Sequence, residues 1–136
     1  MIAFALDASA VASWAFSDEN EPIAVAAYER LRTEQACVPA HWWFEVRNAL
    51  IVSERRGRIR DTETKTFLMG LVLLPIAIDR APDEAGILAL ARRHRLTFYD
   101  AAYLDVANRL SVPLATLDKK LAAAALAENL SLLQAP

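Results

Sequence analysis

Four acidic residues stand where parallel α/β folds usually place their chemistry. Asp7 closes a short apolar run near the N-terminus, and Asp118 closes another near the C-terminus. Glu45 and Asp100 each fall in the first turn of a predicted helix. Open parallel sheets bind ligands beyond the C-terminal ends of their strands, and the helices that follow those strands begin at the same edge. We therefore expect the four carboxylates to converge at one end of the molecule.

Carboxylates gathered in this way need a cation. Like charges a few ångströms apart raise one another's pKa and oppose folding. Mg²⁺ and Mn²⁺ prefer oxygen ligands, and Mg²⁺ keeps several of its waters. Zinc is disfavoured, because the chain has only two histidines and one cysteine. A hydrated metal among acids suits phosphodiester hydrolysis, since it polarises the phosphoryl oxygen, generates hydroxide and stabilises the leaving oxygen.

Three of the acids also have a purely structural interpretation. Asp118 precedes a short helix and suits an N-cap. Thr97 stands three residues before Asp100, which is the spacing of a capping box. The helix dipole alone favours Glu45 in a first turn. Asp7 is harder to explain, because an acid that closes a buried strand needs a partner or a cation. Taken together, the four acids favour a functional site over four separate structural roles.

Apolar runs and helical periodicities alternate along the chain. This alternation predicts an α/β fold with a mostly parallel sheet covered by helices on both faces. Without a linker or an internal repeat, the 136 residues are expected to form a single domain, residues 1–136. Strands are predicted over residues 2–6, 36–38, 76–78, 113–116 and 130–133, and helices over residues 9–16, 22–33, 42–55, 61–73, 84–94, 97–110 and 119–126.

Composition and charge exclude several classes of protein. A chain with 55% hydrophobic and 24% charged residues is not disordered. The net charge of −2 means that binding to nucleic acid would need local basic clusters or bound cations. The arginines at positions 55, 56, 58 and 60 are typical of a solvated surface, whereas Lys119 and Lys120 directly follow Asp118 and are better candidates for phosphate contacts.

The sequence also predicts a cytoplasmic protein that is not bound to membranes. Cys37 is the only cysteine, so no internal disulfide forms and a reducing compartment is expected. The N-terminus lacks the basic flank of a signal peptide, and the longest apolar run, residues 67–77, is too short to span a bilayer. That run is apolar on nearly every side of its predicted helix, which indicates burial or an interface.

Four short motifs give the chain a family resemblance. They are Leu-Asp-Ala-Ser at residues 6–9, Glu-Val-Arg-Asn-Ala-Leu at residues 45–50, Thr-Phe-Tyr-Asp-Ala-Ala-Tyr-Leu at residues 97–104 and Ala-Thr-Leu-Asp at residues 115–118. Each motif is weak alone. In this order, across essentially the whole chain, they resemble the PIN-domain ribonucleases, and within these the VapC-like toxins of toxin–antitoxin pairs.

The resemblance implies a PIN fold, with a five-stranded parallel sheet flanked by helices. It implies an Mg²⁺- or Mn²⁺-dependent endoribonuclease, a homodimer and an antitoxin protein that covers hydrophobic grooves. By the same resemblance Asp7, Asp100 and Asp118 would bind the metal, and Glu45 would bind metal or help to deprotonate the attacking water. The hydroxyls of Ser9 and Thr116 would form hydrogen bonds within the site, and Asn48 would support Glu45 from one helical turn away.

Two other functions stay open from the sequence. The first is a PIN fold retained only as an interaction module, which would not need all four acids. The second is a different α/β phosphoryl-transfer enzyme, but a haloacid-dehalogenase-like site would need an acid where Ser9 stands. A P-loop or dinucleotide site would need glycines after a strand, which the chain lacks.

Outside the site, we expect Asp105, His41 and His94 to lie at the surface.

Overall fold

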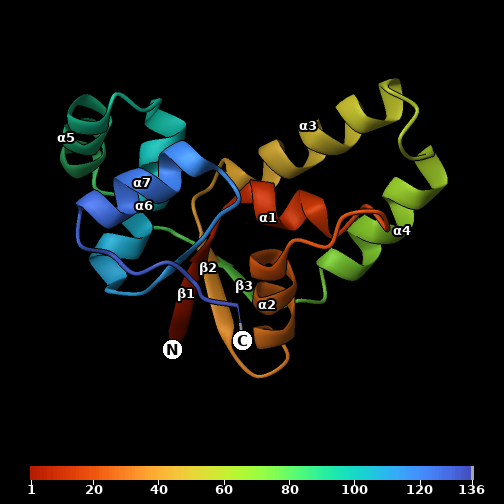
Figure 1. Ribbon diagram of the computed structural model, residues 1–136, viewed down its shortest axis with the longest axis horizontal. Helices are drawn as coiled ribbons and strands as arrows, with labels where there is room; N and C mark the ends of the chain where they lie inside the picture. The colour runs from red at the N-terminus through yellow and green to blue at the C-terminus, as the bar shows by residue number, and fades with distance from the viewer. Residues whose placement is uncertain (136) are drawn as a thin grey trace.

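The computed structural model describes residues 1–135, and its strands form one parallel sheet. The spatial order is β3-β2-β1-β4, so β1 is flanked on both sides. These are the expected α/β fold and the expected parallel pairing (Figure 1). The strands are β1 (Ile2–Leu6), β2 (Gln35–Val38), β3 (Ile76–Ile78) and β4 (Leu114–Ala115).

The expected fifth strand is wrong. In place of a strand over residues 130–133 the structure has an isolated bridge between Leu114 and Leu132. Because β4 is only two residues long, residues 130–133 have no longer strand beside them with which to form a ladder of hydrogen bonds. Leu133 is nevertheless almost completely buried, so the apolar pattern that predicted a strand reflects packing against the core.

Seven helices cover this sheet in the described part of the chain. In Figure 1, α5, α6 and α7 gather on one side of the sheet, and α1 to α4 lie on the other. Both faces are therefore covered, as a parallel sheet requires. The helices are α1 (Ala8–Ser13), α2 (Pro22–Arg30), α3 (Trp42–Arg55), α4 (Asp61–Leu71), α5 (Glu84–His94), α6 (Phe98–Leu110) and α7 (Lys119–Ala127).

Helix α6 contains the longest unbroken run of buried residues among the helices of the described chain. It packs against β1 and lies between α5 and α7. Every residue from position 101 to position 107 is buried, and three of these are alanines, which allow neighbouring elements to approach closely. Because α6 is enclosed on several sides, side chains far apart around its circumference are all shielded from water.

This enclosure overturns the surface expectation for Asp105, which is only 3% exposed. Its carboxylate accepts a hydrogen bond from Arg109 Nε at 2.8 Å. The Arg109 guanidinium also binds Asp79, the acid that follows β3. The ion pairs therefore join α6 to the end of β3 and satisfy a buried charge, as burial requires.

The expectation for the histidines is also wrong in part. The side chain of His94 is 13% exposed, and its Nε2 lies 2.6 Å from Glu128 Oε2 beyond the end of α7. Arg93 binds the same carboxylate at 2.7 Å. The C-terminal ends of α5 and α7 are thus joined by one acid. His41 lies beside Glu45, as described below.

No helix among residues 1–135 combines the length and the apolar character needed to cross a lipid bilayer.

Candidate functional site

The direction in which strands are added to the sheet reverses between β1 and β4. From β1 the chain adds β2 and β3 on one side, and it returns later to add β4 on the other. Ligands of open α/β sheets bind beyond the strand ends at such a reversal. Asp7 follows β1 directly, and Thr116 and Asp118 follow β4. Two of the predicted acids are therefore brought together at this edge.

Asp7 lies at the centre of a small hydrogen-bond network. Its Oδ2 accepts one hydrogen bond from Ser9 Oγ and one from Thr116 Oγ1, both at 2.7 Å. The Ser9 hydroxyl accepts from the backbone N–H of Leu117 at 3.0 Å, and Thr116 accepts from that of Asp118 at 3.0 Å. Because the backbone donates to both hydroxyls, the hydroxyl protons are directed toward the Asp7 carboxylate.

The pKa of Asp7 is raised above its ordinary value. Burial is the largest cause, because it disfavours the charged form. The hydrogen bonds from Ser9 and Thr116 lower the pKa, and the negative charges of Glu45 and Asp100 raise it further. Asp7 is therefore a buried acid with opposing influences on its charge. The hydroxyl groups of Ser9 and Thr116 favour its ionised form, and the nearby carboxylates disfavour it.

Glu45, in the first turn of α3, is held by two aromatic residues. The Tyr103 hydroxyl donates a hydrogen bond to Glu45 Oε1, and His41 Nε2 lies 3.2 Å from the same oxygen. Burial by itself would raise the pKa of Glu45, but His41 and Tyr103 outweigh it and leave the pKa lowered. Glu45 is thus held in its ionised form.

The sequence analysis missed Tyr103 and His41, although helical spacing contained a signal for both. Tyr103 stands three residues after Asp100 on α6, and His41 stands four residues before Glu45. Residues with these spacings lie on the same face of a helix. The His41 ring also packs against the rings of Tyr99 and Tyr103, with 5.2 Å between centroids in each case.

Asp100 lies in the first turn of α6, close to the other acids. Thr97 Oγ1 accepts a hydrogen bond from the Asp100 backbone N–H at 3.0 Å, so the expected cap is present. The pKa of Asp100 is raised, first by burial and then by the negative charges of Asp118 and Glu45. Thr97 and His41 oppose that shift. Asp100 therefore both takes part in the cap of α6 and lies among the neighbouring acids.

Asp118 also has a structural role, because it is the N-cap of α7. Its Oδ1 accepts hydrogen bonds from the backbone N–H groups of Lys120 at 2.9 Å and Leu121 at 3.2 Å. Capping uses this one oxygen of the carboxylate. The Nζ of Lys120, one of the two candidates for phosphate contacts, donates to the carbonyl of Arg95 at 2.8 Å.

The acids are neighbours without forming a complete metal cage. Across residues 1–135, no three His, Cys, Asp or Glu side chains are grouped closely enough to hold one ion. Proteins commonly bind Mg²⁺ through one or two carboxylates and leave the remaining positions to water. A donor set made of carboxylate oxygens therefore fits a hydrated Mg²⁺ or Mn²⁺ ion better than an ion enclosed by protein ligands.

Asn48 is placed beside Glu45 but not bonded to it. Both residues line a cavity that opens between the starts of α3 and α6. Within the described residues the Asn48 amide has no hydrogen-bond partner. No direct contact therefore supports the expected role of Asn48 in holding Glu45.

Comparison with known proteins identifies the relatives of this chain. The PIN domain family matches residues 4–127. The ribonuclease VapC3 of Pyrobaculum aerophilum is 33% identical over 121 residues, which cover 86% of this chain and 90% of the relative. The ribonuclease VapC12 of Mycobacterium tuberculosis is 33% identical over 118 residues, which cover 86% of this chain and 88% of that protein.

The fold matches a solved structure. The crystal structure of PAE2754 from Pyrobaculum aerophilum superposes with a TM-score of 0.71 and 25% sequence identity. The superposition covers 90% of this chain and 84% of that one. The overall fold of this chain is therefore one that has been seen by experiment in a similar chain.

Proposed function

This chain belongs to the PIN-domain family, and on that premise we propose that it is a metal-dependent endoribonuclease. It hydrolyses RNA phosphodiester bonds with a metal-activated water, and Mg²⁺ or Mn²⁺ is the cofactor. One observation carries the proposal. Asp7 is a buried acid, 6% exposed, that the Thr116 hydroxyl links to the backbone of Asp118 at the edge where such folds bind ligands. The ribonuclease names of the relatives support the same activity.

In this proposal each acid has a defined role. Asp7, Asp100 and Asp118 hold the metal, directly or through its waters. When bound, the metal supplies charge to polarise the phosphoryl oxygen and to acidify a bound water. The hydroxyls of Ser9 and Thr116 fix the ionised Asp7 carboxylate in place.

Glu45 has the complementary role of accepting a proton. Its lowered pKa keeps it ionised near neutral pH, and the Tyr103 hydroxyl fixes one of its two oxygens. An ionised carboxylate held in this way orients the attacking water and accepts its proton. The alternative of a PIN fold retained only for interactions gives no reason for this arrangement of acids.

The activity is tested with purified protein and a mixture of cellular RNAs. We expect cleavage with Mg²⁺ or Mn²⁺ and none with a chelator. The substitutions Asp7→Asn, Asp100→Asn and Asp118→Asn should each abolish cleavage, whereas Asp61→Asn, at an exposed acid on α4, should not. If the parent protein cuts no RNA with either metal, or if Asp7→Asn cuts as well as the parent, the proposal is wrong.

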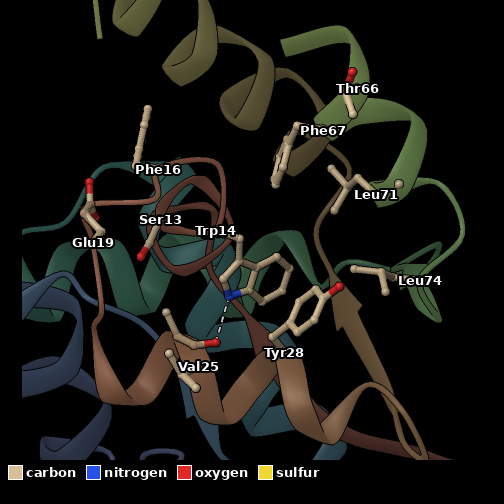
Figure 2. Close-up of a pocket in the computed structure, with 12 residues that line it drawn as sticks. Ser13, Trp14, Phe16, Glu19, Val25, Tyr28, Thr66, Phe67, Leu71 and Leu74 are labelled. Carbon is tan, nitrogen blue, oxygen red and sulfur yellow. Dashed lines mark hydrogen bonds between the residues drawn. The ribbon is translucent and has the colours of Figure 1, made fainter. Parts of the chain in front are cut away.

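We further propose that the protein is the toxin of a toxin–antitoxin pair and acts in the cytoplasm. A groove of about 370 Å³ between α1, α2 and α4 is the proposed antitoxin site. Figure 2 shows Trp14 and Tyr28 facing Phe67 and Leu71 of α4 across it. The Trp14 indole donates to the carbonyl of Ala24 at 2.7 Å, so the groove wall is preorganised.

The groove is lined by different residues from those around the acids, so an apolar antitoxin segment would occupy it without entering the cleavage site. The apolar run that the sequence assigned to burial or an interface, residues 67–77, includes the exposed residues Met69, Val72 and Leu73. This exposure favours the interface. Phe67→Asp should weaken antitoxin binding and leave RNA cleavage by the isolated toxin unchanged. A variant that binds antitoxin like the parent would rule out the groove.

The homodimer also remains a proposal. Mass measurement of the isolated protein in solution tests it directly, and a single species with the 15.0 kDa mass of one chain would contradict it.

A further inference from the structure

A second cavity lies directly beside the proposed cleavage site. It has a volume of about 390 Å³ and opens between the start of α3 and the first turn of α6. This volume is within the range of small-molecule sites. The lining residues are His41, Phe44, Glu45, Asn48 and Tyr99. Because Glu45 belongs to both the cavity and the acidic site, an occupant of the cavity would lie next to the reacting phosphate.

The cavity is walled by aromatic rings that remain in contact with solvent. Phe44 is 69% exposed and Tyr99 is 61% exposed, and the two rings come from different helices. The His41 ring packs against Tyr99 at 5.2 Å, which limits the positions open to that ring. Exposed aromatic rings are the surfaces on which unpaired nucleic-acid bases stack.

Polar groups accompany the aromatic walls. The Asn48 amide carries two donors and an acceptor on the cavity wall, with no partner among the described residues, and amides of this kind pair with base edges. Beside the cavity, the Arg47 guanidinium lies 3.9 Å from the centre of the Trp43 ring, which packs against Phe44 at 5.0 Å. A cation is thus present near the rim, where an RNA backbone needs one.

We propose that this cavity is a base-binding subsite, in which Phe44 and Tyr99 stack an unpaired RNA base next to the bond that is cut, and Asn48 contacts the edge of that base. The inference rests on the proposed ribonuclease function and adds a substrate requirement to it. The substrate is then RNA in which at least one base at the cut is single-stranded.

The first test uses an RNA whose cut position has been mapped, and the same RNA lacking the base on one or the other side of the cut. With the parent protein, removal of one of these two bases should slow cleavage about fivefold or more, because stacking on an aromatic ring is worth roughly 1–3 kcal/mol per base. Phe44→Leu and Tyr99→Leu should slow cleavage of the intact RNA by a similar factor. These two variants should also lose most of their sensitivity to base removal.

Two further variants serve as controls. Phe44→Trp keeps an aromatic face and should retain the sensitivity to base removal. Phe98→Leu alters an exposed aromatic residue beside Tyr99 that does not line the cavity, and it should behave like the parent protein. If Phe44→Leu and Tyr99→Leu stay as sensitive to base removal as the parent, or if neither flanking base matters, the subsite proposal is overturned.

A binding measurement separates this proposal from the ribonuclease activity. A single-stranded RNA that contains the fluorescent base 2-aminopurine should be quenched by the parent protein and much less by Phe44→Leu, whether or not the RNA is cut. Absence of cleavage together with this difference would overturn the proposed function and keep the subsite. Equal quenching by both proteins would overturn the subsite. If Phe44→Leu turns a dimer into a monomer and slows cleavage of all the RNAs equally, the aromatic surface is an interface between copies, and the proposal is also wrong.

Discussion

The hydroxyl of Thr116 donates a hydrogen bond of 2.7 Å to the carboxylate of Asp7, which lies 109 positions away in the sequence. The same hydroxyl oxygen accepts the backbone N–H of Asp118 at 3.0 Å. One short side chain therefore connects the acid at the end of β1 with the acid beyond β4. This connection is the geometry that the metal-site hypothesis needs, since it places both acids on one edge of the sheet.

Removal of the Thr116 hydroxyl should shift the pH dependence of RNA cleavage. Thr116→Val keeps the shape of the side chain but removes a hydrogen bond that lowers the pKa of Asp7. A hydrogen bond to a charged group is worth about 1.5–3 kcal/mol, which corresponds to about one pKa unit or more. The acidic limb of the pH–rate profile should therefore move by about that amount toward higher pH.

A suitable control is Ser53→Ala, which also removes a buried hydroxyl, one that donates to the carbonyl of Ala49 within α3. Its pH–rate profile should match that of the parent protein. An acidic limb that stays in place in Thr116→Val would show that ionisation of Asp7 does not limit cleavage.

Asp7→Asn should stabilise the fold at neutral pH. The folded-state pKa of Asp7 lies above its ordinary value of 3.8, so the folded protein holds this proton more tightly than the unfolded chain. The free energy of unfolding therefore falls as the pH rises from the ordinary pKa to the raised one, and it stays lower above that interval. The uncharged amide of the Asp7→Asn variant avoids this loss, which is about 1.4 kcal/mol per unit of pKa shift.

Thermal unfolding of the parent protein and Asp7→Asn across a pH series measures this effect. The variant should have the higher melting temperature at neutral pH, and the difference should vanish near pH 3. A parent protein that is more stable than the variant at neutral pH, without added divalent cations, would contradict the prediction.

Divalent cations should reverse that order. A ligand that binds only the folded state stabilises it by about 2.7 kcal/mol at a concentration of a hundred times its Kd. Mg²⁺ or Mn²⁺ should therefore raise the melting temperature of the parent protein and have much less effect on Asp7→Asn. Na⁺ at the same ionic strength controls for screening, and an equal shift with Na⁺ would remove the case for a specific ion.

Tyr103→Phe should impair cleavage by releasing Glu45. The substitution keeps the buried ring but removes the donor to Glu45 Oε1, so the pKa of Glu45 should rise and its carboxylate should lose a fixed orientation. We expect about a tenfold loss in kcat, since a small misplacement of a catalytic group is costly, and little change in KM. Tyr28→Phe, on the opposite side of the sheet, is the matched control, and equal kcat values for the two variants would exclude a positioning role for Tyr103.

Asp105→Ala should destabilise the protein and leave its chemistry intact. The Asp105 side chain is 4% exposed and pairs with Arg109, and removal of one partner of a buried pair costs about 3 kcal/mol. The melting temperature should fall well below that of Asp61→Ala, which removes an exposed acid. RNA cleavage per folded molecule should equal that of the parent, and a specific loss of activity would place Asp105 in the site.

The sequence predicted local structure well where a single short-range interaction determines it. The run at residues 2–6 forms β1 with the expected limits, and the bond between Thr97 and Asp100 caps α6 as the spacing indicated. Asp118 illustrates the limit of such reasoning. It is both an N-cap and one of the neighbouring acids, and spacing alone does not separate the two roles.

The errors occur where tertiary contacts decide the outcome. Asp105 lies around the helix from Asp100, as periodicity suggests, but the start of α5 and the ion pairs that lead to Asp79 cover that side of α6 as well. The contact of Glu45 with Tyr103 depends on how α3 and α6 approach each other, which no motif encodes. The expected fifth strand failed because its partner, β4, is only two residues long.

The order in which the sheet is assembled has a consequence for the cell that makes this protein. Asp7 is synthesised 109 residues before Thr116, yet the hydroxyl that holds it belongs to Thr116, just after β4. Domains fold as units during translation. A growing chain would therefore not complete this acidic site, nor gain the proposed RNA cleavage that depends on it, before Thr116 has been added.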